Sequence, residues 1–145
     1  MTQLKNKKGF TLIELLVVIA IIGILSSVVL SNLSGARTKA YDSKVQAQLS
    51  HIRDSAEIYY LNNGNYGVAT SSCSGGMFGD TVTGMVNLTK SVNYPVGENT
   101  IICNSTATAY AVSDNLSASS TYWCVDSTGA SKQESAAQAS STVCA

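Results

Sequence analysis

The chain has 145 residues, of which 45% are hydrophobic and 12% are charged, and its nine basic and nine acidic side chains leave no net charge. This length favours one domain with a modest core, and the balanced charge gives no basic surface for nucleic acid, so nucleic acid is not an expected partner. The apolar residues crowd into the first third, whereas serine and threonine mostly follow it. Two physically different segments therefore share the chain.

The N-terminal segment joins a basic end to a long apolar run. Residues 1–9 contain no acid and three lysines, and residues 10–30 carry a single charge, Glu14; the lysines are Lys5, Lys7 and Lys8. About 20 apolar residues cross the hydrocarbon core of a bilayer as a helix, and flanking lysines stay on the cytoplasmic side. We therefore expect one membrane span with the rest of the chain outside. A conventional secretory signal is disfavoured, because its apolar region is shorter and ends in a small-residue cleavage site.

Glu14 is the unusual residue of this span. An ionised carboxylate within a membrane costs a few kcal/mol unless it is paired or lies near the interface. We expect Glu14 to have a partner. The alternative is an interfacial acid that protonates or reaches the headgroups.

The run from Lys7 to Leu25, with Gly-Phe-Thr-Leu-Ile-Glu-Leu after the basic stretch, resembles the N-terminus of type IV prepilins and type II secretion pseudopilins. In that family a membrane prepilin peptidase removes the basic leader after the glycine, and the new N-terminal phenylalanine is N-methylated. The resemblance implies cleavage between Gly9 and Phe10 and N-methylation of Phe10. It also implies that Glu14 pairs with the N-terminal amine of a neighbouring subunit. Since desolvation offsets much of the attraction in a buried ion pair, Glu14 is expected to set register more than affinity.

The second part of the predicted helix is amphipathic. Apolar residues recur at steps of four and three, which places them on one face of a helix: Val45, Leu49, Ile52, Ala56 and Tyr59. Asn62-Asn63-Gly64 is typical of a helix end. One helix is therefore predicted from about Phe10 to Leu61.

The remaining residues predict a small sheet. Residues 64–99 are rich in Gly, Ser, Asn and Thr and are expected to form a connecting loop with one short helix. Three stretches rich in β-branched and aromatic residues predict an antiparallel meander, followed by a turn at 127–130 and a loose tail; they are 100–103, 108–113 and 121–126. The expected fold is α+β and pilin-like, with about three strands packed on the amphipathic half of the helix. Its predicted parts are a leader (1–9), a membrane or filament-core helix (10–30), an amphipathic half (31–63) and a globular head (64–145).

Four cysteines lie in the polar part without a C-x-x-C pair: Cys73, Cys103, Cys124 and Cys144. Such spacing disfavours zinc and favours disulfides formed in an oxidising compartment. Spacing alone permits three pairings. We prefer Cys73 with Cys103 and Cys124 with Cys144, because these links would pin the connecting loop and the tail to strands, each contributing about 3 kcal/mol.

Catalytic and metal chemistry find little support. His51 is the one histidine, and it lies in mid-helix without a surrounding motif, so a solvated helix position is expected. Asp114 and Asp126 lack the dense oxygen spacing of a calcium loop. We expect no enzyme activity, no cofactor and no metal.

The sequence thus predicts the structural subunit of an extracellular helical filament, either a type IV pilin or a type II secretion pseudopilin. Its expected partners are other copies and related pilins, the prepilin peptidase, a membrane assembly platform with a cytoplasmic ATPase, and membrane lipid before assembly. The expected location is the inner membrane as a single-pass precursor and then a surface or envelope filament. Two alternatives stay open: a minor pilin acting in adhesion or DNA uptake, and a single-span protein that does not polymerise.

Overall fold

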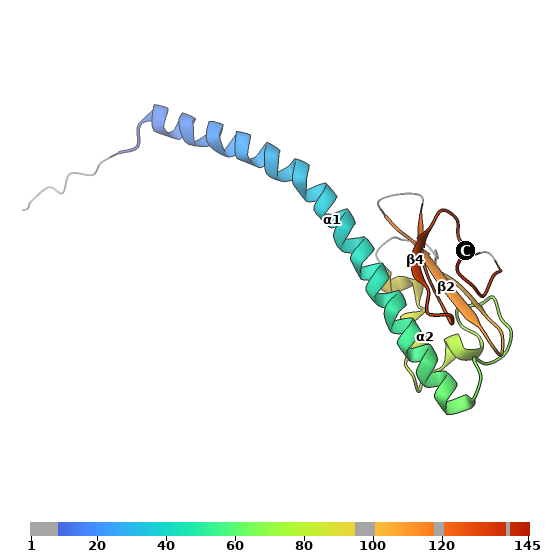
Figure 1. Cartoon of the computed structure of the whole chain (residues 1–145). Helices are drawn as coiled ribbons and strands as arrows, with labels where there is room; N and C mark the ends of the chain where they lie inside the picture. Colours follow the sequence, from blue (N-terminus) through green and yellow to red (C-terminus); the bar gives the residue numbers. More distant parts are fainter. Residues whose placement is uncertain (1–8, 95–100, 118–120, 139) are drawn as a thin grey trace, which may run out of the picture. The chain divides into compact units, whose positions relative to one another are not determined.

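The computed structural model describes residues 9–94, 101–117, 121–138 and 140–145, so Lys5, Lys7 and Lys8 of the predicted leader lie outside the described residues. In chain order the elements are α1 (Leu12–Asn63), η1 (Gly76–Gly79), α2 (Met85–Leu88), η2 (Ser91–Asn93), β1 (Ile102–Ser105), β2 (Tyr110–Asn115), β3 (Tyr122–Asp126) and β4 (Ser131–Glu134) (Figure 1). The chain divides into two compact units, Met1–Arg37 and Thr38–Ala145, and α1 contributes to both. The finer division at residues 9 and 30 stays a prediction.

The long predicted helix is present as α1, which has 52 residues and begins two positions later than expected. Its N-terminal part is long and apolar enough to cross a membrane, and none of its most apolar stretch is buried within the chain. At the other end, Gly64 has a positive φ of 71°, and its N–H donates to the carbonyl of Tyr60 at 2.7 Å. This left-handed residue ends the helix, as the Asn-Asn-Gly sequence predicts.

The amphipathic face of α1 forms one wall of the core in the second unit. Val45, Leu49, Ile52 and Ala56 are all fully buried, and Tyr59 packs against them half-buried. They contact the side chains that β2 and β3 place on one face of the sheet, among them Val112 and Val125. The helix face predicted from the spacing is therefore the buried one.

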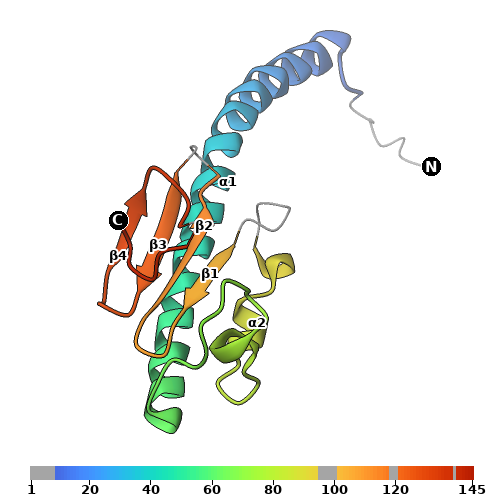
Figure 2. The same ribbon diagram turned by 90° about the vertical axis from the view of Figure 1, so that its right-hand side faces the viewer.

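The sheet is an antiparallel meander with the order β1-β2-β3-β4 (Figure 2). Cys103 pairs with Val112, and Val112 with Val125, so these residues share the face that packs on α1. Alternate residues point the other way. Ala111 and Cys124 therefore form a second, smaller cluster with Cys144 on the opposite face.

The fourth strand is the main addition to the expected sheet. The sequence predicts a loose tail after the turn at 127–130, yet Ser131–Glu134 pairs with β3 along its length. Its sequence, Ser-Lys-Gln-Glu, has neither β-branched nor aromatic residues, so local propensity gives no strand signal. The pairing follows from the tight turn at 127–129, which brings the chain back alongside β3.

The connecting segment holds three short helical pieces in place of the single helix expected. It lies over the core through Met77, Phe78 and Met85, all fully buried, and an isolated bridge joins Thr70 to Ser105. The backbone is closely packed at Gly79, the last residue of η1, where an added Cβ would lie 2.6 Å from the carbonyl oxygen of Ser74. A side chain at this position would force the backbone to move.

Two disulfides close the second unit. Cys73 is bonded to Cys103 and Cys124 to Cys144, with Cα–Cα distances of 5.1 and 5.9 Å. These are the two pairs preferred from the sequence. The second bond, together with β4, holds the segment that was expected to be a loose tail.

Candidate functional site

The residues around the start of α1 form a small hydrogen-bonded unit. The backbone N–H and the hydroxyl of Thr11 both donate to Oε2 of Glu14, at 2.9 and 2.7 Å. In return, the N–H of Glu14 donates to the Thr11 hydroxyl at 3.3 Å. This reciprocal arrangement is a capping box, which satisfies backbone donors that a helix N-terminus leaves unpaired.

The capping box begins at Thr11, the residue after Phe10, and places the Glu14 carboxylate beside the first turn of α1. Glu14 is expected to have a partner in another subunit, and the structure adds this local one within the chain. The signal was present, because Thr-x-x-Glu before an apolar run is the pattern of a capping box. Glu14 therefore has an intrachain contact that orients its carboxylate toward the N-terminal end of the helix.

Gly9 and Phe10 lie just before α1 without regular structure. Both are exposed, and 86% of the Phe10 surface is accessible. The peptide bond between them is therefore sterically open, as a protease substrate must be.

The surface that follows is apolar throughout. Large hydrophobic side chains expose about half or more of their surface along this stretch: Leu12, Ile13, Leu15, Leu16, Val17, Val18, Ile19, Ile21, Ile22, Ile24, Leu25, Val28, Val29 and Leu30. Soluble monomers rarely expose contiguous apolar patches beyond a few hundred Å². This part of α1 therefore needs lipid or other protein around it.

Asp114 and Asp126, the acids considered as calcium ligands, are buried and have structural roles in the fold. Asp126 is fully buried, and its Oδ1 accepts hydrogen bonds from the N–H and hydroxyl of Thr128 and from the N–H of Ala130, at 2.6 to 3.1 Å. Its Oδ2 accepts from the N–H of Cys144 at 2.8 Å. Burial opposes ionisation, but these hydrogen bonds prevail and hold the pKa of Asp126 below its usual value. Both oxygens are thus engaged by the turn and the tail, and Asp114 is likewise fully buried.

His51 and the tyrosines near the end of α1 have surroundings typical of structural residues. His51 lies exposed on α1. The tyrosines near the helix end pack on one another, since the ring of Tyr66 lies 4.8 Å from that of Tyr60 and 4.9 Å from that of Tyr110. The Tyr66 hydroxyl donates to Glu57 at 2.9 Å, and burial together with this acid raises the pKa of Tyr66 to about 12.

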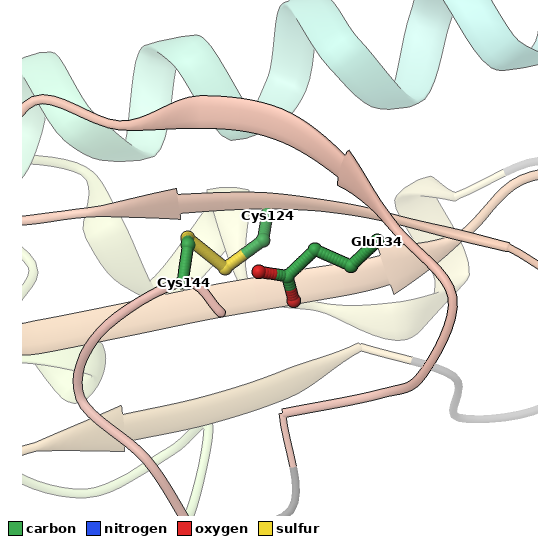
Figure 3. A group of neighbouring side chains, drawn as sticks. All are labelled: Cys124, Glu134 and Cys144. Atoms are coloured by element: carbon green, nitrogen blue, oxygen red, sulfur yellow. A yellow bond between two sulfur atoms is a disulfide. The ribbon is translucent and has the colours of Figure 1, made fainter.

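One group of side chains has the residue types of a metal site but no free thiolate to bind a metal. A carboxylate oxygen of Glu134 and the sulfurs of Cys124 and Cys144 lie within 4.8 Å of one another (Figure 3). The sulfurs are bonded to each other and provide no thiolate. In the oxidised protein this group therefore cannot bind a metal as a cysteine site does.

Comparison with known proteins connects the N-terminal segment to a described motif. Residues 4–30 match the family described as the prokaryotic N-terminal methylation motif. The chain is 49% identical over 63 residues to the Type IV wide pilus major component PilA4 of Thermus thermophilus, covering 43% of this chain and 48% of that protein. It is 40% identical over 63 residues to the Type II secretion system core protein G of Klebsiella pneumoniae, covering 43% of this chain and 45% of that protein.

The core protein G of Vibrio cholerae gives a similar result, with 36% identity over 66 residues. The chain spans slightly less than half the length of the curated relatives it matches. The motif covers the start of α1, and the similarity to the two groups of relatives extends over 63 to 66 residues. Together they show that residues 4–30 carry the N-terminal methylation motif and that part of this chain is similar to a type IV pilus component and to type II secretion core proteins.

Proposed function

We propose that this chain is the structural subunit of an extracellular helical filament, a type IV pilus or a type II secretion pseudopilus. It acts by assembly and not by catalysis. Its precursor is anchored in the inner membrane by the apolar part of α1, is cut by prepilin peptidase between Gly9 and Phe10, and is N-methylated at Phe10. A platform with a cytoplasmic ATPase then moves it into the filament.

The observation that carries this proposal is the match of residues 4–30 to the methylation motif on a helix whose apolar side chains are exposed. A motif alone would explain processing, and an exposed apolar helix alone would explain membrane anchoring. Their combination supports a subunit that exchanges lipid for other copies of itself. The relatives, one named a pilus major component and the other a secretion-system core protein, support both forms of filament.

Electrostatics gives Glu14 its role in this proposal. Cleavage after Gly9 creates an α-ammonium at Phe10, four residues before Glu14. Removal of both groups from water is unfavourable unless each finds a partner of opposite charge. The capping box keeps the Glu14 carboxylate at this end of α1, where the amine of a neighbouring subunit can reach it.

Intact-mass measurement and N-terminal sequencing of protein extracted from cells test the processing step. We expect a mature chain that begins at Phe10 and carries one added methyl group. A chain that keeps Met1 would contradict processing and favour the single-span alternative, and cleavage after Ser26 or Ser27 would favour a conventional signal.

Electron microscopy of sheared surface material, compared between wild-type cells and cells lacking the gene, tests the assembly step. Loss of all filaments in the deletion strain indicates a major subunit. Unchanged filament number with lost adhesion or DNA uptake would favour the minor-pilin alternative. Filaments that never contain this chain would overturn the proposal.

A further inference from the structure

The two disulfides lie in electrostatically different surroundings. Cys124 and Cys144 are 0% and 6% exposed, and the Glu134 carboxylate lies within 4.8 Å of both sulfurs (Figure 3). Its Oε2 accepts a hydrogen bond from the side-chain amide of Gln138, whereas no donor among the described residues reaches the buried Oε1. An acidic side chain with one hydrogen-bonded oxygen and one oxygen unpaired among the described residues therefore lies beside this bond.

The Cys73–Cys103 bond lies on the wall of an open pocket of about 500 Å³. Cys73 is only half-buried, although Cys103 is 1% exposed. The described residues of this pocket include one cation, Lys90, several serines and no acid. The Lys90 ammonium is itself exposed, and it donates to the side chain of Asn87 at 3.0 Å.

These surroundings have opposite effects on thiol–disulfide exchange. The attacking species is a thiolate, which must reach a sulfur atom, and the displaced sulfur also carries negative charge. A neighbouring carboxylate opposes both charges and a neighbouring ammonium favours both. The accessibility of Cys73 therefore favours exchange at Cys73–Cys103, and among the described residues the cation that lines the same pocket, Lys90, favours it as well.

We propose that Cys73 is the site at which thiols modify this protein, and that the partner is the exposed dithiol of an oxidoreductase or a small dithiol of the same chemistry. The inference does not depend on the proposed filament function. One thiolate of the dithiol attacks Sγ of Cys73, a new S–S bond forms, and the Cys73–Cys103 bond breaks. The electron pair remains on Sγ of Cys103, which takes a proton from water.

The second thiol of the reagent completes the exchange. It attacks the reagent's own sulfur in the mixed disulfide, and Cys73 leaves as a thiolate that is then protonated. The protein disulfide has gained two electrons and two protons, and the dithiol has been oxidised to a disulfide.

The opened protein is expected to keep its fold. The segment that carries Cys73 is also held by the paired backbone hydrogen bonds between Thr70 and Ser105, at 3.0 and 2.9 Å. Met77 and Phe78 of the same segment remain buried in the core. Reduction of this bond therefore loosens the pocket wall without removing the sheet.

Timed reduction of the full-length oxidised protein in detergent tests the inference. Native protein is treated with dithiothreitol, quenched with iodoacetamide, digested and analysed by mass spectrometry. We expect Cys73 and Cys103 to be alkylated about tenfold or more faster than Cys124 and Cys144. The same reaction in unfolding guanidinium is the control, and there the two rates should converge because burial and local charges are lost.

Two charge-neutralising variants separate the electrostatic effect from simple burial. Lys90→Gln should slow reduction of Cys73–Cys103 about threefold, and Glu134→Gln should accelerate reduction of Cys124–Cys144 by a similar factor. Each variant should leave the other disulfide unchanged, which provides an internal control. Equal rates in the native protein, or faster reduction of Cys124–Cys144, would overturn the proposal. Unchanged rates in both variants would overturn its electrostatic part.

Discussion

The two units of the chain differ in where their apolar side chains lie. In residues 38–145 the large apolar residues of α1 point into a core that the sheet and the connecting segment complete, and two disulfides close the unit. In residues 9–37 the apolar side chains of α1 are exposed on all sides. The same helix therefore belongs to a self-sufficient fold at one end and depends on its surroundings at the other. Changes in residues 9–37 should therefore affect assembly, and changes in residues 38–145 should affect stability.

The largest expected effect is on assembly, from Glu14→Ala. We expect membrane insertion and cleavage to survive, because loss of a charge makes an apolar segment a better membrane span. The filament yield should fall at least about tenfold, since the Phe10 α-ammonium would be buried without a carboxylate. Sheared filaments, quantified by immunoblot against the membrane-retained pool, provide the measurement.

Glu14→Asp is the matched control for this change, because it keeps the charge on a side chain one methylene shorter. It should retain part of the filament yield. Wild-type yield from the alanine variant would contradict the assembly role of Glu14 and leave it as a tolerated interfacial acid.

The sharpest test of the second unit is Ile52→Ala, which removes a fully buried side chain from the core face of α1. The free energy of unfolding of the head should fall by about 2–5 kcal/mol, through lost burial and the cavity that remains. Chemical denaturation of the protein in detergent, followed by tryptophan fluorescence, measures it. Ile58→Ala on the same helix is the control, and because Ile58 is 50% exposed it should cost far less. Equal losses would contradict the assigned core face.

Asp126→Asn tests the attachment of the tail. An amide has one accepting oxygen and one NH2 donor, so it cannot accept from both the turn and the N–H of Cys144, and we expect a loss of about 1–3 kcal/mol at neutral pH. Thermal unfolding with both disulfides intact gives the comparison.

The pH dependence of this difference follows from the lowered pKa of Asp126. A carboxyl group whose folded-state pKa is lowered stabilises the fold above its unfolded pKa of about 3.9 and loses that effect as the pH falls through the folded-state value. The wild type and the variant should therefore differ most near neutrality and converge in acid. A difference that stays constant down to pH about 2 would contradict the ionised state of Asp126.

The smallest expected effect comes from Thr11→Val, which removes the hydroxyl of the capping box but keeps the shape of the side chain. An N-cap side chain contributes about 1 kcal/mol to a helix end, so the filament yield should fall only a few-fold. Thr11→Ser keeps the hydroxyl and should match the wild type. The immunoblot used for Glu14 applies here, and equal yields from the valine and serine variants would show that the cap has no part in assembly.

The features predicted from sequence are those with a strong local signal. Most of α1 can be predicted, because helix periodicity and left-handed termination are short-range effects. The signals are the apolar run, the three- and four-residue spacing from Val45 to Ala56, and Asn-Asn-Gly at the helix end. The prepilin resemblance rests on a contiguous motif, so it was also visible without a structure. The cleavage site, the N-methylation and the pairing of Glu14 between subunits stay predictions.

Other features depend on residues that meet only in the folded chain. Ser131–Glu134 becomes a strand because β3 is already alongside it, and Asp126 acquires its role because Cys144, 18 positions away, donates to it. The capping box is different, because Thr11 and Glu14 have its local sequence pattern and also lie close together in the structure. The long helix, its two surfaces and the prepilin-like motif can be read from the residues in order, since periodicity and a contiguous motif are local properties. The fourth strand, the buried acids and the different surroundings of the two disulfides become visible only in the folded chain, because burial and charge at a residue depend on what the rest of the chain places around it.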